Sequence, residues 1–406
     1  MSTRSGGNGP PFLALVLFFA ACAAPEQVDF DRWFAHIAPR EADRWYGRHD
    51  WLPDAGAGFY AAAASDRPLL LWILSGDPLS CDCAHELEGP RSVWSDPTVE
   101  RFVAESVPAA DAIWELLTRD DAASRWLSEQ LGGSPRSGVY LLAASGELLA
   151  DCHSLVRDVL LDALGRGLER FEELGPSRST PARAPQGLLE HRFERYRPEH
   201  GLVLTCFTRE LPGELDPAGA RSQVVRTDQV WFSAEERRGL VPDGLVPGER
   251  FEVPRPLALR LARLHFLDDL RGPVRPFSAA EVERADWSGW LVSKDSGRLE
   301  LEYAGRTRAV GRDEETGEFG VETSFSGRAE FDRRTARFSS FRLVARGVRF
   351  GRALTNARVG QEAPSPIGFA LEPTGASLLR FAPPRHADFY RATGFSPVKA
   401  NAGTGR

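Results

Sequence analysis

One stretch of the chain, residues 67–111, constrains the fold more than any other. It opens with a short apolar run, Leu69–Leu74, which follows an Asp-Arg-Pro stop signal and has the length of a buried strand. A loop then brings two cysteines, Cys81 and Cys83, to the start of a helix predicted over residues 83–93. This order of strand, thiol-bearing loop and helix predicts an α/β unit with sulfur at the end of a strand.

The segments around this stretch supply the other elements of such a unit. Residues 98–105 follow Ser-Asp-Pro, an N-cap with a proline in the first turn, so they are predicted to be helical. The turn Ala-Ser-Gly joins apolar runs at 138–143 and 147–151, which predicts a β-hairpin. The other predicted elements are a leading helix, a second strand, a further helix and a closing amphipathic helix, at 58–65, 107–112, 122–131 and 156–174.

The composition of the chain changes after this unit. Residues 175–187 are rich in Pro, Ser, Arg and Gly without apolar periodicity, which predicts a linker. A chain of 406 residues has room for two domains, each with its own core. The predicted organisation is a signal peptide at 1–24, an α/β domain with an N-terminal helical extension at 26–174, the linker, a β-rich domain at 188–395 and a disordered tail at 396–406.

The second domain alternates apolar and polar residues, as antiparallel strands with one buried face do. One amphipathic helix, at about 256–270, interrupts this pattern, and its leucines are expected to pack on the sheet. The segment 265–269, His-Phe-Leu-Asp-Asp, closes that helix. Cys206 is expected to be buried and inert. Trp231, Trp287 and Trp290 are expected to be core residues, with the lining of a pocket as the alternative. The expected strands are 202–209, 287–292, 299–303, 321–331, 336–344, 348–352 and 367–372.

The N-terminus has the features of an export signal. Arg4 supplies positive charge, residues 12–21 are apolar, and small residues follow. The sequence Phe-Ala-Ala-Cys ending at Cys22 resembles the lipobox of bacterial lipoproteins, which predicts lipidation of Cys22. The alternative is ordinary cleavage after Ala23 or Ala24. Both predict an exported protein of the cell envelope or periplasm, in contact with a membrane only through such a lipid anchor.

The charge balance limits the classes of partner. A net charge of −7 argues against nucleic-acid binding, which needs a basic surface. Nearly all the positive charge is arginine, because Lys294 and Lys399 are the only lysines. No phosphate loop or nucleophile elbow is present, and no strand precedes the glycine pair at 56–58, so no nucleotide cofactor is predicted.

Residues 56–174, somewhat less than a third of the chain, resemble the thioredoxin-like superfamily, in particular its exported bacterial branch. The matching residues are Arg67-Pro68, Leu69–Leu74, Ser95-Asp96-Pro97, Val99, Phe102-Val103, Val107-Pro108, Asp111 and the hairpin at 138–149. The resemblance implies an α/β thioredoxin-like domain, followed here by a β-rich domain of antiparallel sheet plus one helix. It also places Pro78 near the family's attacking cysteine, and Ser137-Gly138 where the family has a cis-proline.

Three functions are compatible with these residues. In the first, Cys81 and Cys83 exchange disulfides with exported protein thiols, aided by the positive end of a helix. In the second, the thioredoxin-like unit is a non-catalytic module joined to a β domain that binds a ligand or an envelope partner. In the third, Cys81, Cys83 and His85 bind Zn or Cu, with Cys152 or His153 completing the shell. The sequence leaves enzymatic activity, substrate, redox direction and oligomeric state open.

Overall fold

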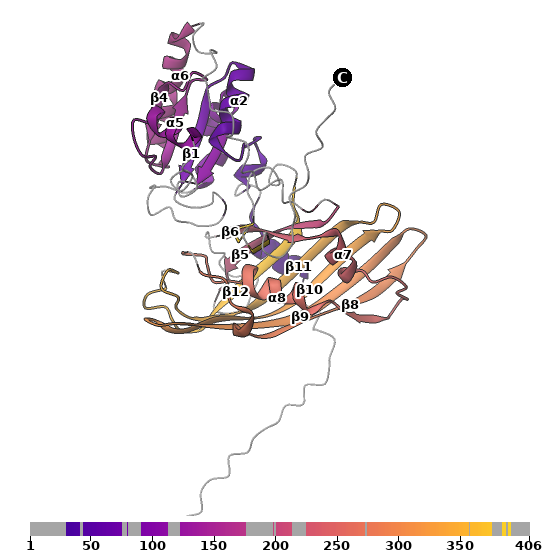
Figure 1. Cartoon of the computed structure of the whole chain (residues 1–406). Coiled ribbons are helices and arrows are strands. Elements are labelled where there is room, and N and C mark those ends of the chain that lie inside the picture. Colours follow the sequence, from indigo (N-terminus) through magenta and orange to yellow (C-terminus); the bar gives the residue numbers. More distant parts are fainter. Residues whose placement is uncertain are drawn as a thin grey trace, which may run out of the picture.

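The computed structural model describes residues 30–40, 44–74, 79, 91–112, 122–175, 198, 200–212, 225–272, 274–356, 358–375, 384–386 and 389–390. Its N-terminal part contains a mixed four-stranded sheet with helices, and its C-terminal part contains an eight-stranded sheet (Figure 1). Every strand pairing in the larger sheet is antiparallel. The predicted two-part division into α/β and β-rich regions is therefore present.

The smaller sheet has the strand order β2-β1-β3-β4. Its central strand β1 (Leu69–Leu74) pairs in parallel with β2 (Val107–Ala112) and antiparallel with β3 (Gly138–Leu142). The hairpin partner β4 (Leu148–Cys152) pairs antiparallel with β3. All residues of β1 are buried because helices cover both faces of the sheet, which accounts for its uninterrupted apolar sequence.

Two pairs of helices cover this sheet. Helices α2 (Ala55–Ser65) and α5 (Ala122–Gln130) lie on the face formed by Leu69 and Leu71. Helices α3 (Pro97–Glu105) and α6 (Arg157–Glu173) lie on the opposite face. The Asp96 carboxylate accepts a hydrogen bond from the Thr98 amide (2.8 Å), which confirms the predicted cap of α3. Helices α2, α3, α5 and α6 and the hairpin lie close to their predicted positions.

Four tryptophans pack together beside α3 and β1. Trp45 lies in a 3₁₀ helix (Trp45–Gly47), Trp72 in β1 and Trp94 in a second 3₁₀ helix (Arg91–Ser95), while Trp51 lies between them. Their ring centroids are 5.1–6.0 Å apart and mostly edge to face, an arrangement that aromatic quadrupoles favour. This cluster makes the core of the N-terminal unit apolar and aromatic.

The larger sheet has the strand order β6-β5-β12-β11-β10-β9-β8-β7. The sequence predicts two strands at 336–344 and 348–352. The structure has one continuous strand there, β11 (Arg337–Gly351), so the predicted break is wrong. Strand β6 and helix α7 (Ala234–Leu240) were not predicted. The strands are β5 (Leu202–Glu210), β6 (Val225–Phe232), β7 (Arg250–Glu252), β8 (Val282–Lys294), β9 (Arg298–Asp313), β10 (Gly317–Asp332), β11 (Arg337–Gly351) and β12 (Ser365–Pro373).

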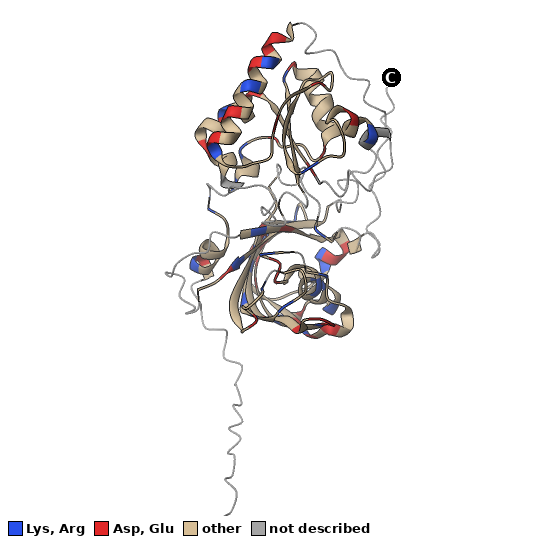
Figure 2. Cartoon of the chain, turned by 90° about the vertical axis from the view of Figure 1, so that its left-hand side faces the viewer, with Lys and Arg blue, Asp and Glu red and all other residues tan. Residues whose placement is uncertain are grey.

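A short helical segment fills the concave side of this sheet. Helix α8 (Arg255–Arg260) continues into one π-helical turn (Leu261–His265), and the sheet curls around both (Figure 2). Leu257 and Leu261 belong to the main apolar core with residues from the strands. The predicted packing of this helix on the sheet is confirmed, but the helix ends at His265 rather than near residue 270.

Helix α1 (Phe30–Ile37) packs on the outer face of the larger sheet, although it had been assigned to the N-terminal domain as an extension. It covers Phe207, Val344 and Ala370 of β5, β11 and β12. Three strand arginines, Arg328, Arg342 and Arg346, stack over its rings, each with its guanidinium carbon 4.9 Å from a ring centroid. The aromatic face of α1 is therefore matched to the second sheet.

Described residues of the N-terminal unit contact the larger sheet, and Arg44 stacks over Phe207 of β5, with its guanidinium carbon 5.3 Å from the ring centroid. The Thr227 amide on edge strand β6 donates to the carbonyl of Leu79 (3.1 Å). Arg44 pairs with Glu372 on β12 (2.7 Å). Among the described residues, no helix is both long and apolar enough to cross a membrane.

Candidate functional site

The predicted thiol site is described only in part. Cys22, Cys81, Cys83 and His85 lie outside the described residues, as does most of the helix predicted at 83–93. The directions of the described strands place the two remaining candidates, Cys152 and His153. Because β4 is antiparallel to β3, and β3 to β1, strands β1 and β4 end at the same edge of the sheet. Cys152 and His153 therefore lie at the edge from which the cysteine loop leaves.

The Cys152 side chain lies in the core beneath α6. Its thiol donates to the carbonyl of Ser154 (3.1 Å), and burial raises the pKa of this thiol. A raised pKa keeps the sulfur protonated, whereas a metal ligand or nucleophile must be a thiolate. Cys152 therefore has the properties of a small buried apolar residue. The same holds for Cys206, which is buried with a raised thiol pKa, as predicted.

Both ring nitrogens of His153 contact neighbouring residues. Its Nδ1 lies 2.7 Å from the carbonyl oxygen of Ser137, its Nε2 lies 3.2 Å from Asp151, and its ring meets Tyr140 edge on. Within the described ranges, no group of three or more His, Cys, Asp or Glu side chains is placed to hold a metal. The metal shell proposed from the sequence would thus depend on residues outside those ranges.

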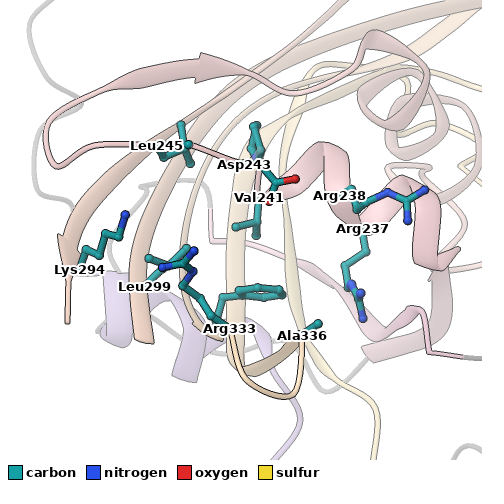
Figure 3. A pocket seen from close by; sticks show the side chains of 12 residues that line it. Arg237, Arg238, Val241, Asp243, Leu245, Lys294, Leu299, Arg333 and Ala336 are labelled. Atoms are coloured by element: carbon teal, nitrogen blue, oxygen red, sulfur yellow. The ribbon is translucent and has the colours of Figure 1, made fainter. Parts of the chain in front are cut away.

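A different site is formed at one end of the larger sheet, where three separate segments meet (Figure 3). The last turn of α7 and the loop after it form one side, and the ends of β8 and β9 form another. The turn between β10 and β11 closes it. The three segments enclose a pocket of about 370 Å³, hereafter the basic pocket.

Local sequence signals position each wall of the basic pocket. A capping box between Ser233 and Glu236 starts α7 and places Arg237 and Arg238 in its last turn, where cations are favoured by the helix dipole. Gly244, with a φ of +82°, allows the loop after α7 to turn back. The opposite walls are the tight turns at Asp295 and Asp332.

The basic pocket carries an excess of positive charge. Arg237, Arg238, Lys294 and Arg333 line it with a single carboxylate, Asp243. Among the described residues, no carboxylate lies within salt-bridge distance of these four cations. In Figure 3, Arg237 and Arg238 come from α7, Lys294 from the end of β8 and Arg333 from the turn between β10 and β11. The pocket is therefore locally basic, although the net charge of the whole chain is −7.

The nearest acidic residues in the two turns are engaged elsewhere. Asp295 accepts from the amides of Gly297 and Arg298, at 3.0 and 2.7 Å. Asp332 accepts from the amides of Arg334 and Thr335, at 2.8 and 3.4 Å. These backbone hydrogen bonds lower the pKa of both carboxyl groups. The two carboxylates therefore shape the turns, and neither lies within salt-bridge distance of the four pocket cations.

The floor of the basic pocket is apolar. Val241, Leu245 and Leu299 are buried there, and Phe331 lies beside them. The Arg237 guanidinium stacks on Phe331, with its carbon 6.0 Å from the ring centroid. Burial, followed by the positive charges of Arg238 and Arg337, lowers the pKa of Arg237. The pocket thus combines apolar surface with an arginine that is partly desolvated and repelled by like charges.

A second polar cluster lies buried inside the larger sheet. His265 Nδ1 lies 2.8 Å from Asp228, and His265 Nε2 lies 2.8 Å from the Tyr390 hydroxyl. Asp269 contacts Arg226 and pairs with Arg385, 2.6 Å away. A neighbouring group joins Asp268 to Arg349 (2.7 Å) and Arg358 (3.5 Å). In both groups each buried carboxylate faces a cation or an imidazole, so the loss of one partner would leave an uncompensated charge in the core.

Comparison with protein-family models, with curated proteins and with solved structures finds no match to this chain. The site must therefore be judged on its own geometry. Sequence reasoning missed the basic pocket because its cations come from three turns far apart in the chain. The only available signals were the pair Arg237-Arg238 and the placement of Lys294, one of the two lysines.

Proposed function

We propose that the β-rich unit is a binding domain for a small anionic ligand that has an apolar part. The observation that carries this proposal is the basic pocket, in which four cations surround an apolar floor and one carboxylate. The proposal corresponds to the second function suggested by the sequence, a non-catalytic module joined to a ligand-binding β domain.

The energetic reason is that, among the described residues, no carboxylate lies within salt-bridge distance to compensate the positive charge of Arg237. Arg237 loses hydration and is repelled by Arg238 and Arg337, so an anion that enters the pocket relieves both costs. A carboxylate, phosphate or sulfate accepts charge-assisted hydrogen bonds from guanidinium groups, often through two parallel bonds. The partly buried Phe331 ring, with the remaining exposed surface of Val241, Leu245 and Leu299, provides contact area for an attached apolar group.

Titration calorimetry with matched probes tests this proposal. Octyl phosphate is expected to bind about ten-fold more tightly than octyl glucoside, which has the same chain without charge. Arg333→Gln is expected to remove most of this preference, whereas Arg166→Gln, on the exposed surface of α6, is the charge-matched control. Equal affinity for the two probes, or an equal loss in both variants, would refute the proposal.

We further propose that the N-terminal unit is thioredoxin-like and serves as a module attached to this binding domain. Supporting features are the strand order β2-β1-β3-β4, the reversed direction of β3 and the helices on both faces. Export, and lipidation of Cys22, complete the proposal. Mass spectrometry of the mature N-terminus tests both, and an unprocessed Met1 would contradict them.

A second candidate function is thiol–disulfide exchange through Cys81 and Cys83. It is favoured by the position of these cysteines shortly after β1, the buried central strand. Thiol trapping of protein taken directly from the cell envelope tests it. A disulfide that responds to the ambient redox poise supports exchange, and the tight binding of Zn(II) or Cu(I) by both thiolates would support the metal alternative instead.

A further inference from the structure

A second hollow adjoins the basic pocket. It is an open depression of about 570 Å³, lined by His200, Arg237, Thr335, Ala336 and Arg337. Arg237 and Ala336 line both hollows, so the two share a wall. Each hollow also has a cation of its own: Arg333 and Lys294 in the basic pocket and Arg337 in the second hollow.

Arg237 is held at the junction of the two hollows. Its Nη1 donates to the carbonyl of His200 (2.7 Å), which belongs to the second hollow. Its guanidinium stacks on Phe331, which belongs to the basic pocket. The Arg237 side chain is therefore held by one contact from each hollow, and its other guanidinium N–H groups can donate to a ligand.

The charges on the two sides act on the same arginine. Arg238 lines the basic pocket and Arg337 lines the second hollow. Burial is the largest cause of the lowered pKa of Arg237, and the positive charges of Arg238 and Arg337 lower this pKa further. Among the described residues, neither Arg237 nor Arg337 has a carboxylate within salt-bridge distance. A single anion in the basic pocket would leave Arg337 uncompensated.

From this arrangement we infer that the ligand is an organic dianion, with one anionic group in each hollow and an apolar segment between them. This inference rests on the proposed function and specifies its ligand class. Arg237, Arg333 and Lys294 bind the first anionic group in the basic pocket, and Arg337 binds the second. Phosphate and carboxylate share the required chemistry, since both present oxygens to guanidinium donors.

The test compares octyl phosphate with 1,8-octanediyl bisphosphate by titration calorimetry, using the full chain at one fixed ionic strength. The bisphosphate is expected to bind about ten-fold more tightly to the unmodified protein. Arg337→Gln is expected to abolish that advantage while changing the affinity for octyl phosphate by less than about two-fold. Arg333→Gln is expected to weaken both probes.

The controls separate this inference from the proposed function. Arg166→Gln removes the same charge from a distant surface and is expected to leave both affinities unchanged, and urea unfolding verifies that each variant is folded. Equal binding of the two probes, or an advantage that survives Arg337→Gln, would overturn the dianion and leave the anion pocket standing. Failure of both probes to bind would overturn the proposed function as well.

Discussion

Two sets of arginines in the larger sheet differ in what faces them. Arg226, Arg349 and Arg358 are almost fully buried, and each faces Asp268 or Asp269. Arg237 and Arg333, at the basic pocket, face no carboxylate among the described residues. A buried cation without a partner is costly, so the buried set must be neutralised for the protein to fold. The pocket set is exposed enough to remain charged and unpaired, which leaves it available to a ligand.

This comparison predicts its largest effect at Asp269. Asp269→Asn leaves Arg226 and Arg385 without their shared carboxylate in the core, so the free energy of unfolding should fall by about 3–5 kcal/mol. Urea denaturation measures this loss. Asp243→Asn makes the same change at the basic pocket and should alter stability by less than about 0.5 kcal/mol. If the two variants lost similar amounts of unfolding free energy, the proposed difference between the buried arginines and the pocket arginines would be contradicted.

The next largest effect is expected on binding alone. The double variant Lys294→Glu/Arg333→Glu reverses two pocket charges, so the affinity for octyl phosphate should fall about 100-fold. Stability should stay within about 0.5 kcal/mol of the parent, or rise slightly, because like charges are removed from one another's vicinity. A stability loss comparable with that of Asp269→Asn would show that the pocket charges also support the fold.

The buried set should also make the protein sensitive to acid. Burial, with the charges of Arg385 and Arg226, lowers the pKa of His386 from 6.5 to about 3. The unfolded chain binds a proton at higher pH than the folded chain does. Stability is therefore complete above about pH 6.5 and is lost as the pH falls towards 3.

The free energy of unfolding is expected to fall by about 1–2 kcal/mol between pH 7 and pH 5, and His386→Phe should largely remove this loss.

Asp228 is expected to cause a second loss of stability at lower pH. Burial raises its pKa, but the hydrogen bond and charge of His265 and the charge of Arg226 outweigh burial and hold the pKa below its usual range. The stability it contributes is full above about pH 4 and declines below. Chemical denaturation across this range measures both, and a flat profile would contradict the account.

The smallest predicted effect concerns salt. Raising the ionic strength from about 50 to 300 mM should weaken octyl phosphate binding by a few-fold, because the pocket cations are solvent-accessible. The same change should leave the free energy of unfolding within about 0.5 kcal/mol, since buried pairs are screened much less. Binding that ignores salt would indicate that apolar contact alone drives it.

The N-terminal elements could be predicted because their apolar periodicity matches what they bury. Leu69–Leu74 and Val107–Ala112 were predicted at their observed ends. Strand β6 was missed because Arg226 and Asp228 are charged in sequence, although tertiary pairing lets them be buried. Strand β11 was divided at Gly347, where a side chain would collide with the backbone carbonyl of Glu322.

The polar sites were harder to predict than the strands. The segment 265–269 was interpreted as the polar end of a helix, yet His265, Asp268 and Asp269 are buried centres of the two charge networks. Only the partners reveal this role, and they come from β6, from β11 and from Arg385 and Tyr390 near the C-terminus. The basic pocket likewise depends on turns that come together only in the folded chain. Sequence periodicity reports burial along one segment and carries no signal for such convergence.

The most direct test of the central claim is a crystal structure of the protein with octyl phosphate bound. The account predicts the phosphate within about 4 Å of the Arg237 and Arg333 guanidinium groups, with the octyl chain over Val241, Leu245 and Leu299. A phosphate bound elsewhere on the protein, with the basic pocket empty, would contradict it.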